Sequence, residues 1–169
     1  TPGRHPGEWQ GNTTETSFRR PPGRRFVVAS TAAPMSTNVA EALVEEVLQR
    51  TGWPTTRITP GLYRCDGVGS ARKNLMVRID PAGYVAAAIV PVAASPRDAK
   101  KAAALYKRLL ELNHQLLMAR FCIDDDLDVL LAVEHPTADL DASELEAALD
   151  LLAHYIDAHG AEIEALASA

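Results

Sequence analysis

Hydrophobic residues recur along this chain with two different spacings. From Val39 to Arg50 and from Ser95 to Met118 the apolar positions return every three or four residues, which is typical of amphipathic helices. Thr56–Cys65, Asn74–Ile79 and Tyr84–Val92 come closer to alternation and predict strands. The chain is therefore expected to begin with a helix, an antiparallel meander of three strands and a second helix.

The same spacings continue toward the C-terminus. Arg120–Ile123 and Val129–Glu134 predict a hairpin around Asp124–Asp128. A long acidic helix is expected to begin near Asp141, where Glu144 stands in the capping-box position. Its regular apolar seam is typical of a helix packed across a sheet, with a coiled dimer seam as the alternative. The whole pattern, α-βββ-α-ββ-α, predicts an α+β fold with helices packed on an antiparallel sheet.

Local signals predict where the elements begin and end. Asn38 is expected to cap the first helix, and Gly52 with Pro54 to end it. Ser95 is expected to cap the second helix. Because Pro60 is followed by glycine, the first strand region is either an edge strand or two short pieces.

Residues 1–34 show neither spacing. They are rich in Gly, Pro, Ser and Thr, carry five Arg against two Glu, and predict a disordered basic leader. The pair Arg24-Arg25 invites comparison with an export signal, but the following apolar run is shorter than the roughly 7–15 residues such a signal needs. Met35 stands just before the first helix, so we expect either a natural start there or a dispensable leader. Residues 35–169 are expected to form a single domain.

Charge and composition exclude several classes of partner. Residues 35–169 contain 12 basic and 20 acidic side chains, and residues 121–169 contain 13 Asp or Glu and no Lys or Arg. Such a surface repels a phosphate backbone, so no nucleic acid is expected despite the arginines of the leader. No apolar run reaches the roughly 18 residues of a membrane helix, so no membrane partner is expected. The two cysteines form no CxxC pair and fit a reducing cytoplasm.

No combination of residues predicts catalysis, a metal site or a cofactor. Asp124–Asp128 places carboxylates at the first, third and fifth positions of a calcium loop. However, Val129 stands where that loop needs glycine and His135 where it needs glutamate. The histidines lack ligand spacing, and Ser70 lacks the glycine-flanked turn of a nucleophile. We therefore expect a protein that is not an enzyme.

One segment carries a resemblance to known families. The pattern Leu-Asn-x-x-Leu-x-x-Ala-Arg-Phe at residues 112–121, followed by aspartates at 124–126, lies within this order of elements. Over roughly residues 38–166 it resembles the YbjN family and the type III secretion chaperones typified by CesT. The chaperone resemblance implies a small, acidic, usually homodimeric protein that holds a secretion substrate in extended form along hydrophobic patches. The YbjN resemblance implies a sensory-transduction regulator.

We predict a cytoplasmic, non-enzymatic domain, chaperone-like or regulatory, that forms a homodimer and holds a partner polypeptide on hydrophobic grooves. The alternative is a regulatory domain that binds a small ligand or a signalling partner in one enclosed pocket. The second helix has a wider apolar stripe than one sheet contact needs. The candidate residues are Trp53, Leu62 and Tyr63 for a partner surface, and Leu105, Leu109, Leu112 and Leu116 for the core or a dimer face.

Overall fold

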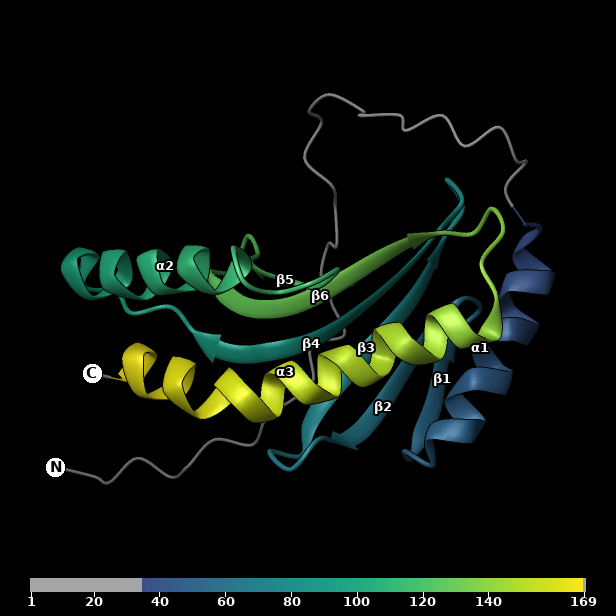
Figure 1. The fold of residues 1–169 in the computed structure, drawn as a ribbon, viewed down its shortest axis with the longest axis horizontal. Coiled ribbons are helices and arrows are strands. Elements are labelled where there is room, and N and C mark those ends of the chain that lie inside the picture. Colours follow the sequence, from purple (N-terminus) through teal and green to yellow (C-terminus); the bar gives the residue numbers. More distant parts are fainter. Residues whose placement is uncertain (1–34, 169) are drawn as a thin grey trace, which may run out of the picture.

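The computed structural model describes residues 35–168 and shows three helices and one sheet (Figure 1). The predicted α+β class and arrangement of helices are confirmed. The first strand region forms two short strands joined at Pro60-Gly61, which was one of the two alternatives predicted for it, so the sheet has six strands. The predicted leader over residues 1–34 lies outside the described residues. In chain order the elements are α1 (Thr37–Thr51), β1 (Thr55–Thr59), β2 (Leu62–Val68), β3 (Lys73–Asp80), β4 (Tyr84–Ala94), α2 (Ala99–Asn113), β5 (Arg120–Ile123), β6 (Asp128–Pro136) and α3 (Ala142–Ser168).

The sheet is antiparallel, with the strand order β1-β2-β3-β4-β6-β5. Strands β1 to β4 form a meander, and the hairpin of β5 and β6 joins it through β6, where Ala87 of β4 pairs with Val133. Because β1 and β5 come last on either side, they are the two edges of the sheet in the described part of the chain.

One face of the sheet carries the core. Alternate residues of the central strands, such as Leu75 and Val77 on β3, point to the helices and are fully buried. The seam of α3 packs across β4 and β6, and Leu149 and Leu152 are fully buried there. Of the two alternatives predicted for the apolar seam of α3, packing across the sheet is therefore the one that the structure shows. All three helices contribute to the same cluster, so they lie on the same face.

Two predicted helix starts are wrong and one is confirmed. Helix α1 begins after Ser36 rather than after Asn38, and α2 is capped by Asp98 rather than by Ser95. Asp98 Oδ1 accepts a hydrogen bond from the backbone N–H of Lys101 at 2.9 Å. The capping box at the start of α3 forms as predicted. There the carboxylate of Asp141 accepts from the Glu144 N–H at 2.9 Å, and Glu144 accepts from the Asp141 N–H at 3.2 Å.

Helix α2 ends at Asn113, five residues before the predicted end at Met118. The side chain of Asn113 donates to the backbone oxygen of Phe121 at 3.0 Å and accepts from the Phe121 N–H at 2.7 Å. This pair ties the end of the helix to the start of β5. Leu116 consequently lies in the connection after the helix, partly buried against the core, and not on the helical stripe.

Candidate functional site: a groove between α1 and β1

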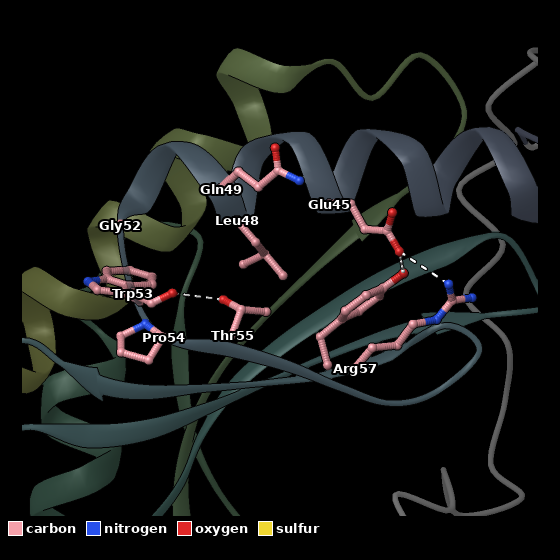
Figure 2. A pocket seen from close by; sticks show the side chains of 9 residues that line it. Glu45, Leu48, Gln49, Gly52, Trp53, Pro54, Thr55 and Arg57 are labelled. Carbon is pink, nitrogen blue, oxygen red and sulfur yellow. Dashed lines mark hydrogen bonds and ion pairs between the residues drawn. The ribbon is translucent and has the colours of Figure 1, made fainter.

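An open groove of about 460 Å³ lies between the C-terminal half of α1 and strand β1 (Figure 2). Figure 2 shows Trp53 and Pro54 at one end and Glu45 and Arg57 at the other, with Leu48 of α1 between them. The full lining is Glu45, Leu48, Gln49, Gly52, Trp53, Pro54, Thr55, Arg57 and Tyr63. The groove therefore has an aromatic end and a charged end.

The turn between α1 and β1 holds Trp53 in place. Gly52 ends the helix with a φ of 70°, a left-handed conformation that glycine adopts without strain. The Thr51 hydroxyl donates to the Leu48 oxygen at 2.8 Å and accepts from the Trp53 N–H at 3.3 Å. The Thr55 hydroxyl donates to the Trp53 oxygen at 2.9 Å. These bonds fix the backbone on both sides of Trp53, whose ring packs partly against the core and partly lines the groove.

Tyr63, Glu45 and Arg57 form the charged end. The Tyr63 hydroxyl donates to Glu45 Oε1 at 2.9 Å, and Arg57 Nη1 lies 3.3 Å from the same oxygen. Arg57 also pairs with Glu41 at 2.8 Å. Burial, and secondly the hydrogen bond to Glu45, raise the pKa of Tyr63 to about 12. Tyr63 therefore remains a protonated donor near neutral pH and links β2 to α1 beneath the groove.

Strand β1 presents an open edge beside this groove. All five of its residues are exposed, and in the described part of the chain β1 pairs with β2 alone. The side chain of Ile58 is 47% exposed, which is high for a large aliphatic residue in a sheet. An unpaired edge offers backbone donors and acceptors to another extended segment.

A second apolar surface lies at the opposite end of the sheet, around the end of α2, strand β5 and the hairpin that follows it. It is called the α2–β5 surface here, and its outer side includes a hollow along α2 lined by Tyr106 and Leu110 among others. Its exposed large apolar side chains, with their exposed fractions, are Leu110 (70%), Leu117 (71%), Met118 (55%), Ile123 (38%) and Leu127 (56%).

The structure brings two of the predicted partner residues together. Trp53 and Tyr63 both line the groove, whereas Leu62 lies partly buried on β2 outside its lining. The three leucines of the predicted stripe that fall within α2 lie in the interior, which corresponds to the core alternative of the prediction and leaves them no free surface. These are Leu105, Leu109 and Leu112, with exposed fractions of 0, 3 and 0%.

Sequence reasoning missed Glu45, Arg57 and Ile58. The contact between Glu45 and Arg57 joins residues 12 positions apart on different elements, so no local spacing indicates it. Ile58 lies in a strand whose burial depends on whether the edge is covered. A short strand interrupted by Pro and Gly was the available signal, since that pattern indicates an edge.

The other residues considered for metal binding or catalysis do not form such a site in the described part of the chain. Asp124 Oδ1 accepts from the N–H groups of Asp126 at 3.0 Å and Asp128 at 2.9 Å, and so closes the hairpin turn. Among residues 35–168, no group of three or more His, Cys, Asp or Glu side chains is placed to hold a metal ion. Cys65 and Cys122 are free thiols whose pKa values are raised by burial. No described helix has the length and apolar character needed to cross a membrane.

Two solved complexes share this fold, and YbjN shows a further structural similarity. The ExsC–ExsE complex aligns with a TM-score of 0.56 at 15% identity, over 76% of this chain and 96% of the matched chain. The HopA1–SchA chaperone–effector complex aligns with a TM-score of 0.53 at 14% identity, over 75% and 96%. YbjN from E. coli aligns with a TM-score of 0.48 at 10% identity, over 78% and 95%.

Sequence comparison gives the family. No curated protein sequence matches this chain. The CesT_Tir_1 family model matches residues 54–169, which is more than half of the chain and covers β1 through α3. The predicted resemblance to type III secretion chaperones is thereby confirmed. The chain belongs to the CesT_Tir_1 family of type III secretion chaperones.

Proposed function

We propose that this protein is a non-enzymatic chaperone that holds an extended segment of a partner polypeptide in the groove between α1 and β1. The observation that carries the proposal is the open edge of β1, whose five residues are all exposed, beside a groove walled by Trp53 and Tyr63. The neighbouring HopA1–SchA structure is a chaperone–effector complex, which supports a protein ligand for this fold.

The geometry suits a polypeptide better than a small molecule. A segment added to β1 gains backbone hydrogen bonds along the edge, and its alternate side chains face opposite sides of the sheet. On one side they meet the groove, since Thr55 and Arg57 of β1 line it. On the other side they meet Ile58. The open groove does not enclose a ligand, which is what the small-ligand alternative requires.

We further propose that the protein is a homodimer joined through the α2–β5 surface. Five large apolar side chains are exposed there, and a two-fold axis places the same patch against itself. Because β1 and β5 are opposite edges of the sheet, the second copy and the partner polypeptide occupy different ends of the molecule. The two free cysteines support a cytoplasmic location, where thiols stay reduced.

Photocrosslinking from the β1 edge tests the chaperone proposal. Benzoylphenylalanine at Thr56 is expected to form a covalent adduct with one partner polypeptide in the native host, because that side chain lies on the proposed docking edge. The matched control is the same probe at Asp125, which is exposed in the β5–β6 hairpin. The partner adduct should form from Thr56 and not from Asp125. Equal adducts with the partner polypeptide from both positions, or no partner adduct from Thr56, contradict the proposal, whereas an adduct between two copies from Asp125 does not.

A further inference from the structure

We infer that Asn113 closes the β5 edge of the sheet to added strands, so that an extended polypeptide can join the sheet at β1 alone. The inference rests on the proposed function, because it concerns where the partner polypeptide binds. It follows from the direction of the backbone groups on the two edge strands and from the hydrogen bonds that occupy these groups at β5.

The outward backbone groups of β1 are open. In an antiparallel pair, alternate residues turn both their N–H and their C=O toward the neighbouring strand or away from it. The Asp66 N–H donates to the Pro54 oxygen at 2.9 Å, so Pro54 and then Thr56 face β2. Thr55 and Arg57 therefore direct their backbone groups outward, and no hydrogen bond from the described part of the chain occupies them. Their side chains line the groove, so the residues of an added strand that lie opposite them also face the groove.

The backbone of β5 is occupied where that of β1 is open. Phe121 lies opposite Leu131 of β6, but its backbone groups bond to the side chain of Asn113. The Phe121 N–H donates to Asn113 Oδ1 at 2.7 Å, and Asn113 Nδ2 donates to the Phe121 oxygen at 3.0 Å. Both groups therefore point away from β6. The Asp124 N–H donates to the Asp128 oxygen at 3.1 Å on the β6 side, as the alternation requires.

The side-chain amide of Asn113 takes the place of a neighbouring strand. A carboxamide has both an acceptor oxygen and a donor nitrogen, so it satisfies the N–H and the C=O of Phe121 as an opposing backbone residue would. Ala119, the outward position just before β5, has its N–H bonded to the Leu117 oxygen at 2.6 Å. Within the described chain this leaves Ile123 as the open outward residue of β5, and one residue cannot sustain a ladder of hydrogen bonds.

The two edges therefore differ in what they accept. At β1 a polypeptide gains backbone hydrogen bonds, whereas β5 offers a second molecule mainly side chains. Each protomer consequently adds one extended segment, and adds it beside the groove. The second copy proposed at the α2–β5 surface is held through side chains such as Leu110 and Leu117, and the two sheets do not merge into one.

A strand peptide tests the role of Asn113 without the partner. The probe is a biotinylated copy of β6, whose sequence already pairs with β5 on its inner side. Benzoylphenylalanine replaces Ile123, whose side chain is 38% exposed at this edge. Every protein also carries Leu110→Arg/Leu117→Arg, which removes the apolar contact proposed for the second copy. In this background Asn113→Leu is expected to raise the yield of peptide adduct about tenfold, because it frees two backbone groups at nearly constant side-chain size.

Two further variants separate edge closure from loosening of the chain. The Leu117 backbone N–H donates to the Tyr155 hydroxyl at 3.1 Å, so Tyr155→Phe loosens the connection after α2 and leaves Asn113 in place. This matched control should leave the adduct at the level of the background. Asn113→Asp keeps the acceptor for the Phe121 N–H and loses the donor, so it should give a smaller increase than Asn113→Leu. It tests the same claim where the leucine variant does not fold.

Three results overturn the role of Asn113. They are an adduct from the background protein as strong as that from Asn113→Leu, no increase in either Asn113 variant, and an equal increase in Tyr155→Phe. The partner adduct from Thr56 in the native host is measured separately. Its absence removes the chaperone proposal and leaves the peptide result standing, whereas an unchanged peptide yield with a retained partner adduct removes the role of Asn113 alone.

Discussion

Gly69 combines two structural requirements at a single residue. Its φ of 68° lies in the left-handed region, and a Cβ built on it would lie 2.5 Å from Asp157 Oδ1 on α3. That carboxylate accepts from the backbone N–H of Ser70 at 2.6 Å and from its hydroxyl at 2.9 Å. The β2–β3 turn therefore holds α3 through a contact that only glycine permits.

Gly69→Ala is expected to lower the free energy of unfolding by about 3 kcal/mol, from left-handed strain and from displacement of the Asp157 carboxylate. Gly52→Ala is the matched control, because Gly52 has a φ of 70° but no atom within 4 Å of the position that an alanine methyl group would occupy. Gly52→Ala should lower the free energy of unfolding by the backbone strain alone, about 1 kcal/mol. Urea denaturation of both variants measures the difference. Equal costs would show that the contact with α3 contributes nothing.

Tyr63 gives a second prediction at the residue scale. Its pKa of about 12 lies above the ordinary 10.0, so its contribution to stability is complete below pH 10 and declines as the pH rises from 10 toward 12. Tyr63→Phe is expected to lower the free energy of unfolding by about 1–2 kcal/mol at pH 8, because Glu45 loses one of its two donors and keeps only Arg57. The cost should shrink at pH 11. Urea unfolding at both pH values measures it, with Tyr106→Phe on α2 as the control, and a cost independent of pH contradicts the prediction.

At the scale of elements, prediction succeeds where the signal is local. The capping box of Asp141 and Glu144 involves residues three apart, and it forms as the sequence indicates. The end of α2 depends on Asn113 binding the backbone of Phe121, eight residues away, and helical spacing cannot reveal that contact. Ser95 is a good capping residue, but its N–H donates to the Leu127 oxygen at 2.9 Å and ties it to the β5–β6 hairpin, and the helix begins three residues later with Asp98 as its cap.

The residues of the candidate site were likewise predictable only where the signal is local in the sequence. Trp53 follows a helix-ending glycine and Tyr63 lies in an alternating strand, so both were identified from the sequence. Their neighbours Glu45 and Arg57 come together because β1 runs back along α1, which is a property of the assembled fold. The apolar stripe of α2 was visible from its spacing. Which of its leucines are interior depends on how α3 and the sheet surround the helix.

The C-terminal half of α3 yields a prediction on pH at the element scale. The Ser70 hydroxyl lowers the pKa of Asp157 below 3.8, and Arg108 lowers that of Glu162 below 4.5. Their contribution to stability is therefore present above about pH 4.5 and is lost as the pH falls through the lowered values.

Asp157→Asn/Glu162→Gln is expected to be less stable than the parent at pH 7, with the difference narrowing as the pH falls below about 4.5. Ser70→Ala should change stability in the same direction by a smaller amount, because it removes the hydroxyl donor of Asp157 and leaves the Ser70 backbone donor in place. Urea unfolding monitored by far-UV circular dichroism at each pH measures the difference. A gap that stays constant to pH 3 would show that these carboxylates do not anchor α3.

The whole molecule is organised by the two edges of its sheet. At the β1 edge a partly apolar groove combines Trp53 with a charged end, which suits a ligand that arrives as an extended chain. At the β5 edge the exposed side chains are large and aliphatic, and the exposed fractions of Leu110 and Leu117 reach 70 and 71%. An apolar surface of this kind suits a permanent contact with a second copy, since water is unfavourable there. The helices cover one face between the edges and keep the two sites apart.

This separation predicts that oligomerisation and partner binding can be removed independently. Leu110→Arg/Leu117→Arg buries charge at the proposed dimer contact, and is expected to convert the homodimer to a monomer in light scattering at micromolar concentration. Ile58→Arg places the same charge at the β1 edge, so it should leave the dimer intact and abolish the partner adduct from Thr56. Both sites are exposed in the single chain, so neither change should lower its stability by more than about 0.5 kcal/mol. A parent protein that is already monomeric, or an Ile58→Arg variant that dissociates the dimer, contradicts the assignment of the two edges.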